Sequence, residues 1–362
     1  FRKEKHGMDY VALETIRELQ KIDQQNEYFI LVSPGDDVCL QESANMHIVT
    51  VNWPSYPLWE QIGLPLALKK IKPDLLHCTS NTAPVYGNIP LMLTLHDIIF
   101  LEKKQGKNQS MYQRLGRFYR KIIVPQILTK CKRIITVSHF ECNRISHFLH
   151  IDKQLLVAVY NGYSQHFIPI RNAQAITARY IKNHPYLFFL GNTDPKKNTA
   201  RVLQAYGIYL KKSSQPLPLL IADLKEEIID EYLNREGLQE IKKMLYHPGY
   251  IPNTELPAVY SGASVFIYTS LRESFGIPIL EAMACGTPVI TSTTSAMPEI
   301  AGPEGILVNP FDPEEIDSAL LHLEENAEFY QSQTAYGLER VRRFSWENTA
   351  REILNIYKEI LA

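Results

Sequence analysis

Several features that would assign this 362-residue sequence to a class of protein are missing from it. No apolar run approaches the roughly 18 to 20 residues of a membrane-spanning helix, and no stretch near Phe1 has the pattern of a signal peptide. The net charge is −1 and no nucleic-acid-binding motif is present, so we expect no nucleic-acid partner. These absences predict a cytoplasmic protein.

Motifs for metals and dinucleotides are also absent. The five cysteines are scattered, form no C-x-x-C pair and are predicted to be reduced thiols: Cys39, Cys78, Cys131, Cys142 and Cys285. The sequence has no D-x-D motif, so we expect no metal site and an activity that needs no divalent metal or other cofactor. It has no G-x-G-x-x-G either, which argues against a nicotinamide dehydrogenase.

What is present is the composition of a globular protein, with 45% hydrophobic and 21% charged residues. Predicted strands and helices alternate along the chain, which indicates parallel sheets covered by helices on both faces. A chain of this length can form two such domains, each with its own core. We therefore predict an α/β protein of two Rossmann-like, doubly wound domains that face a central cleft.

The predicted elements divide the chain into four parts. The first domain covers residues 1–162 and closes with LLVAVYNG, a strand that ends in an Asn-Gly turn. Residues 163–185 lack a clear strand pattern and are predicted to connect the domains. The second domain covers residues 186–345, and residues 346–362 form a last helix that we expect to cross back to the first domain.

The stretch from Tyr268 to Ile290 gathers the residues with the clearest chemistry. A predicted strand, SVFIYTS, leads into a glycine turn at 274–276 and then into a helix with Pro278 in its first turn. The amides of residues 275–277 lie at the helix start, where the helix dipole favours an anion such as a phosphate.

Two carboxylates flank this turn. Glu273 lies on its edge, where it can bind sugar hydroxyls beyond the phosphate. Glu281 lies about one helical turn further on, among apolar neighbours, and needs hydrogen-bond donors that a vicinal diol such as a ribose would supply. Alternatively, both carboxylates only cap and solvate the helix, and their spacing alone does not decide between these interpretations.

The full string ESFGIPILEAMACGTPVITS, followed by PEIAG at 298–302, resembles the C-terminal signature of the retaining, GT-B-fold glycosyltransferases of family 4 (group 1, E-x7-E type). The resemblance implies that Glu273 contacts the donor sugar during catalysis, that Glu281 binds the nucleotide ribose, and that the donor phosphates lie against Ser274, Phe275 and Gly276. It makes 186–345 the nucleotide-sugar-binding domain and 1–162 the acceptor-side domain, whose first strand is missing.

GNTDPKKN at 191–198 follows a strand and opens a helix, so Lys196 and Lys197 can reach an anion there. Without context, two such lysines are more often exposed. The resemblance implies that Lys197 neutralises the donor diphosphate. Many family members have an arginine at the position of Asn192, and whether Lys196 replaces that charge stays open.

Three further residues are assigned through the resemblance. His96 ends the strand PLMLTL within an His-Asp pair, and family members have there a histidine that reaches the donor sugar; a structural histidine is the alternative. Gly7 resembles the remnant of a glycine-rich loop near the phosphates and the acceptor. HPGYIP at 247–252 matches a segment that frames the nucleotide base, where we assign Tyr250.

The sequence thus predicts a hexosyltransferase that uses a nucleotide-sugar donor and retains the anomeric configuration. GDP-mannose is the favoured donor because the PKKN and HD-x-x-F context is closest to mannosyltransferases of surface polysaccharide assembly, and UDP-sugars remain open. The acceptor would be a saccharide or a lipid-linked saccharide. Alternatives are a sugar-nucleotide-binding protein without turnover, and a nucleotide-sugar epimerase.

A basic segment lies between Phe100 and Arg133. It contains ten basic residues, from Lys103 to Arg133, and Glu102 is its only acid. Tyr112, Leu115, Phe118, Tyr119 and Ile122 recur at helical spacing and predict an amphipathic helix with a basic face. That face is either a solvated surface or a docking site for anionic lipid head groups on the inner side of a membrane.

Overall fold

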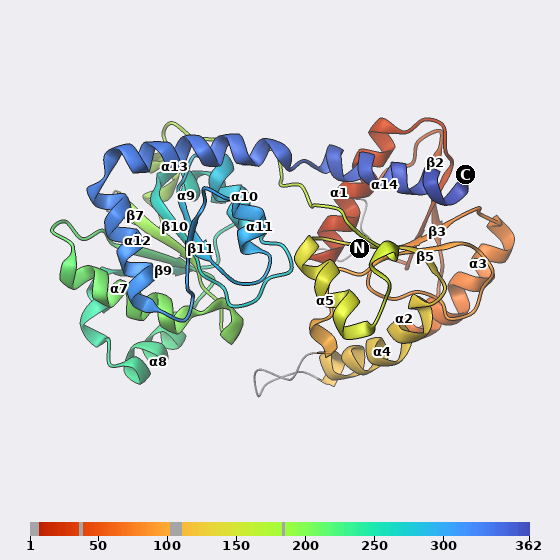
Figure 1. Cartoon of the computed structure of the whole chain (residues 1–362), viewed down its shortest axis with the longest axis horizontal. Coiled ribbons are helices and arrows are strands. Elements are labelled where there is room, and N and C mark those ends of the chain that lie inside the picture. Colours follow the sequence, from red (N-terminus) through yellow and green to blue (C-terminus); the bar gives the residue numbers. More distant parts are fainter. Residues whose placement is uncertain (1–6, 36–38, 102–110, 183–184) are drawn as a thin grey trace. The chain divides into compact units, whose positions relative to one another are not determined.

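The computed structural model describes residues 7–35, 39–101, 111–182 and 185–362. The basic residues at 103, 104 and 107 lie outside these ranges. Helices separate most consecutive strands of the described chain, with β1–β2 and β3–β4 as exceptions, and all pairings between its named strands are parallel (Figure 1). The chain forms two compact units, Phe1–Gly162 together with Ser345–Ala362, and Tyr163–Phe344.

The second unit contains a six-stranded sheet in the order β12-β11-β10-β7-β8-β9. Its strands are β7 (Tyr186–Leu190), β8 (Leu219–Ala222), β9 (Leu245–Gly249), β10 (Ala263–Tyr268), β11 (Val289–Ser292) and β12 (Ile306–Val308). The chain starts in the middle with β7, runs outward to β9, and then returns to the other side with β10. This is the predicted doubly wound order, and such sheets bind ligands at the carboxyl ends of the strands where the order reverses, here between β7 and β10.

Alternate residues of β7 and β10 face different cores. Phe189 and Ile267 join a hydrophobic cluster with residues of the helices on one face. On the other face, the rings of Phe188 and Phe266 pack together and against Tyr260. The helices of this unit are α6 (Gln174–Thr177), α7 (Thr199–Lys212), α8 (Glu226–Glu236), α9 (Leu256–Gly262), α10 (Ile277–Ala284), α11 (Met297–Ala301), α12 (Pro313–Glu325) and α13 (Ala327–Arg340).

The first unit contains a four-stranded sheet, β3-β4-β5-β6, and a pair, β1-β2. The strands are β1 (Tyr28–Val32), β2 (Met46–Thr50), β3 (Leu76–Cys78), β4 (Leu91–Thr94), β5 (Cys131–Thr136) and β6 (Leu156–Ala158). The helices are α1 (Met8–Ile22), α2 (Tyr56–Leu58), α3 (Leu64–Ile71), α4 (Met111–Leu128), α5 (His139–Leu149) and α14 (Trp346–Leu361), with a π-helical segment, Trp59–Gly63, between α2 and α3.

The last helix, α14, packs against α1 in the first unit. Ser345 caps it by accepting a hydrogen bond from the amide of Asn348 at 3.0 Å. The hydroxyl of Thr349 donates to the carbonyl of Tyr160 at 2.6 Å. Gly162 lies against the start of α14, where a Cβ atom would stand 2.2 Å from the amide nitrogen of Trp346. A glycine is therefore required at 162 for close packing. The expected Asn-Gly turn does not form, and the chain is irregular there.

Residues 163–185, which we predicted to connect the domains, belong to the second unit. Phe167 and Ile181 are fully buried, and α6 packs against α9. The segment has no strand because its apolar residues do not alternate, yet they fill space beside the sheet. The segment predicted to connect the domains thus follows the boundary at Gly162 and packs as part of the second unit.

Candidate active site

The turn after β10 has the predicted form of strand, glycine turn and helix. Gly276 has φ 113°, a left-handed conformation that glycine adopts without steric cost, and it precedes the first residue of α10. Pro278 lies within the first two helical positions, where its missing N–H costs nothing. The helix ends before Gly286, which has φ 78°.

Lys197 and Glu273 come together at this turn. The Nζ atom of Lys197 lies 2.7 Å from Oε1 of Glu273 and donates a longer hydrogen bond of 3.4 Å to the hydroxyl of Tyr268. Only 23% of the lysine side chain and 15% of the glutamate side chain are exposed, so water screens this ion pair less than a surface pair. An ammonium group has three N–H donors, and an anion can therefore bind Lys197 beside Glu273.

Asn198 holds the lysine loop in place. Its side-chain amide nitrogen donates to the carbonyls of Thr269, at 3.0 Å, and Pro310, at 2.7 Å. The residue is buried and has φ 64°, which asparagine tolerates better than most side chains. Asn198 thus ties the start of α7 to the loops after β10 and β12. No motif in the sequence indicates this role for Asn198.

Glu281 lies on α10 and is partly buried. Removal from water raises the pKa of its carboxyl group to about 7, although the hydroxyl of Tyr260, 3.3 Å from Oε2, favours the charged form. Further hydrogen-bond donors, such as the predicted ribose hydroxyls, would stabilise the ionised form of this carboxyl group. Tyr260 was missed because it precedes β10 on α9 and shares no local motif with Glu281.

Ser274 and Phe275 complete the turn. The ring of Phe275 is buried and packs edge-on against Phe344, with 6.1 Å between centroids. Its side chain therefore has a structural role, and only its main chain can contact a ligand. The amide of Glu273 donates to the hydroxyl of Ser295 at 3.0 Å, which fixes the beginning of the turn.

Lys196 and Asn192 have their own partners within the lysine loop. The carbonyl of Lys196 accepts a short hydrogen bond, 2.6 Å, from the amide of Leu271. Its Nζ atom lies 3.8 Å from Oδ2 of Asp194. The side chain of Asn192 accepts from the amide of Asp194 at 2.8 Å and shapes the turn. Asn192 is uncharged, so it does not itself supply the positive charge that an arginine would bring to this position.

His96 is buried in the first unit, just after β4. Its Nε2–H donates to the carbonyl of Thr79 at 2.9 Å, which leaves Nδ1 as the acceptor of a neutral ring. Burial lowers the pKa of His96, which favours this neutral form. The ring lines a cavity of about 20 Å³, enough for one water molecule, together with residues of α1 and α14 such as Thr15 and Thr349.

Two predicted residues are exposed. Gly7 precedes α1 with φ 57°, and its carbonyl accepts from the amide of Val11 at 3.1 Å. Tyr250 follows β9 and is 71% exposed, so it can approach a ligand without disturbing the core. Of the predicted residues, the second unit thus brings Lys197, Glu273 and the turn at 274–276 together.

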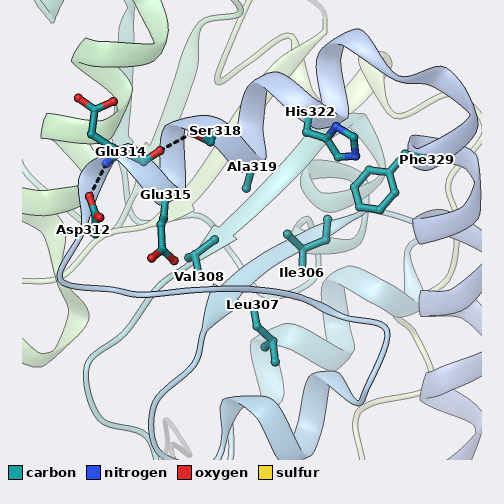
Figure 2. Close-up of a pocket in the computed structure, with 10 residues that line it drawn as sticks. All are labelled: Ile306, Leu307, Val308, Asp312, Glu314, Glu315, Ser318, Ala319, His322 and Phe329. Atoms are coloured by element: carbon teal, nitrogen blue, oxygen red, sulfur yellow. Dashed lines mark hydrogen bonds between the residues drawn. The ribbon is translucent and has the colours of Figure 1, made fainter.

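A separate pocket of about 450 Å³ lies between the edge strand β12 and α12 (Figure 2). None of the predicted site residues lines it. Its carboxylates serve the local structure: Asp312 accepts from the amide of Glu314 at 2.9 Å, and Glu315 accepts from the amide of Asn309 at 2.7 Å. We therefore assign the candidate site to the turn after β10 and not to this larger pocket.

Among the described residues, no group of three or more His, Cys, Asp or Glu side chains is placed to hold a metal ion. Within the same ranges, no helix combines the length and apolar character needed to cross a membrane.

Two protein-family models match the chain, one in each half. The model for glycosyltransferase family 4 matches residues 6–166, and the model for glycosyl transferases group 1 matches residues 174–340. Together they match most of both compact units and leave out residues 345–362 of the first.

The curated relatives include mannosyltransferases from Escherichia coli. The O-antigen chain mannosyltransferase B is 31% identical over 236 residues, which are 64% of this chain and 61% of that protein. The serotype-specific mannosyltransferase WbdA is 23% identical over 319 residues, 83% of this chain and 38% of that protein. The chain thus spans about three fifths of the length of the first relative and about two fifths of the length of the second.

Among solved structures, HepE from Anabaena, determined in complex with UDP-glucose, superimposes with a TM-score of 0.73 at 15% identity. The match covers 99% of this chain and 97% of HepE. At this identity the likeness shows the fold, which is the predicted GT-B fold of two α/β domains.

Proposed function

The chain belongs to the family 4 glycosyltransferases, and from this premise we propose that it transfers a hexose from a nucleotide-sugar to a hydroxyl acceptor with retention of configuration. The observation that carries the proposal is the junction of Lys197 and Glu273 at the reversal point of the second unit's sheet. The bond between the sugar carbon and the phosphate oxygen is replaced, on the same face of the sugar, by a bond from that carbon to the acceptor oxygen. The nucleoside diphosphate leaves with the bonding electron pair, and the acceptor hydroxyl loses its proton, which the departing diphosphate can accept. The diphosphate that leaves gains negative charge.

In this proposal Lys197, Lys196 and the amides at the start of α10 stabilise this charge, each such contact contributing roughly 3 kcal/mol to lowering the barrier. Because these cationic and amide groups supply the stabilisation, we propose that no divalent metal or other cofactor is needed. Glu281 would hold the ribose, and Glu273 would bind sugar hydroxyls next to the phosphate. His96, through Nδ1, would accept a hydrogen bond from the donor sugar.

We propose GDP-mannose as the donor and a saccharide or lipid-linked saccharide of surface polysaccharide synthesis as the acceptor. The mannosyltransferase relatives support mannose as the transferred sugar, whereas the complex of HepE with UDP-glucose supports a UDP-linked donor. The acceptor would lie at the cytoplasmic face of a membrane that contains anionic lipid.

A thermal-shift screen over UDP, GDP, ADP and TDP tests the donor site. A ligand that binds only the folded state stabilises it by about 2.7 kcal/mol at a concentration of 100 times Kd. We expect GDP to raise the melting temperature by several degrees, and Glu281→Ala to abolish the rise. A protein that responds to none of the four at millimolar concentration would not have this site.

A binding protein without turnover is the second candidate, and Asn192 favours it. Its side chain is engaged in the turn and supplies no charge for the leaving group. Both candidates predict nucleotide binding, but only the transferase slowly releases free sugar from its donor when no acceptor is present.

A further inference from the structure

His96 follows β4, and the loop after the neighbouring strand β3 holds it at two points. The ring donates its Nε2–H to the carbonyl of Thr79 at 2.9 Å. The main-chain amide of His96 donates to Oδ1 of Asn81 at 2.7 Å. Thr79 and Asn81 both lie within three residues of the end of β3. One short loop therefore sets the backbone position of His96 and the orientation of its ring.

Asn81 takes the place of a strand residue beside β4. In a parallel ladder, a residue bonds the main-chain groups on either side of the residue opposite to it. The amide of Asn81 donates to the carbonyl of Thr94 at 3.0 Å, and its side chain accepts from His96, so the two bonds flank Leu95. The side-chain carbonyl thus replaces a main-chain carbonyl. On the other side, the amide of Leu95 donates to the carbonyl of Ile135 at 2.8 Å.

The conformation of Asn81 restricts which residue types fit this position. Its backbone is left-handed, with φ 64°, and the residue is 3% exposed. Asparagine and aspartate adopt this conformation more readily than other residues with a side chain, and glycine adopts it at no steric cost. Glycine has no carbonyl to offer the amide of His96. Position 81 therefore needs a left-handed residue whose short side chain carries an acceptor.

The surroundings of Asn81 are fixed as well. The hydroxyl of Thr82 donates to the carboxylate of Glu60 at 2.5 Å, and both residues are buried. Nε2 of His77 on β3 lies 2.7 Å from the hydroxyl oxygen of Thr94 on β4. A left-handed backbone persists where the surrounding structure holds it in this way, and such residues gather at functional sites.

The groups around the ring of His96 leave it neutral. Burial is the main cause that lowers the pKa of His96, whereas Asp97 beside it and Asp9 on α1 act in the opposite direction. His77 is neutral too, because burial lowers its pKa to about 3. A neutral ring that donates through Nε2 has Nδ1 as its acceptor.

We propose that Asn81 is a positioning residue for the transfer reaction: it fixes His96 so that the ring donates to Thr79 and presents Nδ1 to the donor sugar. The inference rests on the role of His96 in the proposed function, and Asn81 acts only through His96. Without the side-chain carbonyl, the buried amide of His96 would lose its acceptor and the residue would shift toward another partner. A displacement of about 1 Å can lower a rate roughly 100-fold.

Two substitutions at Asn81 separate its acceptor from its backbone conformation. Asn81→Gly keeps the left-handed backbone and removes the carbonyl, and we expect kcat to fall roughly 10- to 100-fold at pH 8. Asn81→Asp keeps an acceptor and should retain most of the rate at this pH. The rate is the release of nucleoside diphosphate from whichever of GDP-mannose and UDP-glucose the wild type turns over. The thermal shift by nucleotide should be the same in both variants.

The pH profile gives a second result for Asn81→Asp. Its carboxylate would favour the charged imidazolium of His96 and raise the pKa of the ring. A proton on Nδ1 prevents this atom from accepting a hydrogen bond, so activity falls as the pH drops through that pKa. We expect the acid limb of kcat to move to higher pH by roughly one unit. This shift tests the proposal even if Asn81→Gly does not fold.

Nuclear magnetic resonance of isotope-labelled histidine reads the ring directly. A His96→Gln variant identifies the signals of His96 among the 11 histidines. The wild type and Asn81→Asp at pH 8 should show the tautomer with the proton on Nε2, and Asn81→Gly should show changed ring signals.

Asn45→Ala is the matched control, because Asn45 is a structural asparagine of the same unit. Its side chain donates to the carbonyls of Asp23 and Asn26, both at 2.9 Å. The control should lower the melting temperature and leave kcat and the signals of His96 unchanged.

Wild-type kcat in Asn81→Gly would overturn the proposal, and so would a lowered kcat with unchanged ring signals of His96. An equal loss of rate in Asn81→Asp and Asn81→Gly at pH 8 would also contradict it. A wild type that releases no nucleoside diphosphate would instead defeat the proposed function. The ring signals would then still show whether Asn81 orients His96.

Discussion

At the scale of single residues, Glu281 shows how the fold prepares a side chain for a ligand. Its pKa of about 7, compared with an ordinary 4.5, reflects a carboxyl group that the protein alone does not stabilise as an anion. A bound ribose diol would donate two hydrogen bonds to the ionised form. Binding would thus be coupled to the loss of a proton near neutral pH.

This coupling predicts a pH-dependent affinity for nucleotide. Below pH 7 Glu281 holds a proton that the complex must release, so affinity should fall up to tenfold per pH unit as the pH drops from 7 toward 5. Titration calorimetry with GDP measures this slope. Glu281→Gln should bind GDP more weakly at pH 8. The part of the pH dependence that comes from proton release by Glu281 should be absent in this variant. An equal slope in both proteins would remove Glu281 from the ribose site.

The same pKa predicts the effect of Glu281 on stability. Between pH 4.5 and pH 7 the folded protein holds a proton that the unfolded chain has released, so stability falls as pH rises through that range. Glu281→Gln should therefore raise the free energy of unfolding of the ligand-free protein at pH 8 by about 1 to 3 kcal/mol, with little change at pH 4. If this variant loses nucleotide binding while its free energy of unfolding rises, the variant is folded and the lost binding is not caused by misfolding.

Lys197 should act mainly on the departing diphosphate. Lys197→Ala is expected to lower kcat roughly 100- to 1,000-fold, as removal of a charge-stabilising group does in other enzymes. Lys197→Arg keeps the charge and should recover part of the rate. Initial rates of nucleotide release at saturating donor provide the measurement, and near-normal turnover of the alanine variant would exclude the lysine from the mechanism.

Among the structural elements, the loop between β7 and α7 depends on Asn198. Asn198→Ala would leave the buried carbonyls of Thr269 and Pro310 without this donor and force alanine into a left-handed conformation. We expect a loss of about 2 to 4 kcal/mol of stability, and lower turnover because Lys197 shifts. Urea unfolding measures the first effect. Asn198→Gly, which relieves only the backbone strain, should remain less stable than the wild type.

Some elements could be predicted from local sequence and others could not. β10, the turn and α10 were predictable because an apolar strand run changes to helical spacing at Gly276 and Pro278. β9 was not predicted, because its sequence LYHPG contains a proline and a glycine, which strands rarely hold, and its pairing with β8 stabilises it. The apolar face of α4 was predicted as an amphipathic pattern, but the pattern does not reveal which face the sheet covers.

At the scale of the whole molecule, strand order brings distant residues together. Lys197 follows β7 and Glu273 follows β10, and these strands are neighbours although 76 positions separate the two residues. Local patterns predicted each residue, whereas their ion pair depends on the doubly wound order. The hydrogen bond between Tyr260 and Glu281 is likewise a product of packing. Donor identity could not be predicted from the sequence, because the segment proposed to frame the nucleotide base, HPGYIP, would do so through backbone groups that every residue type has.

The central claim is that this chain breaks the bond between a sugar and a nucleoside diphosphate while keeping the sugar's configuration. Proton NMR of the purified protein with GDP-mannose, and with UDP-glucose in parallel, follows that bond directly. We expect slow release of nucleoside diphosphate without acceptor, with the free sugar first appearing in the anomeric form of the donor. Absence of release from either donor, or first appearance of the opposite anomer, would contradict it.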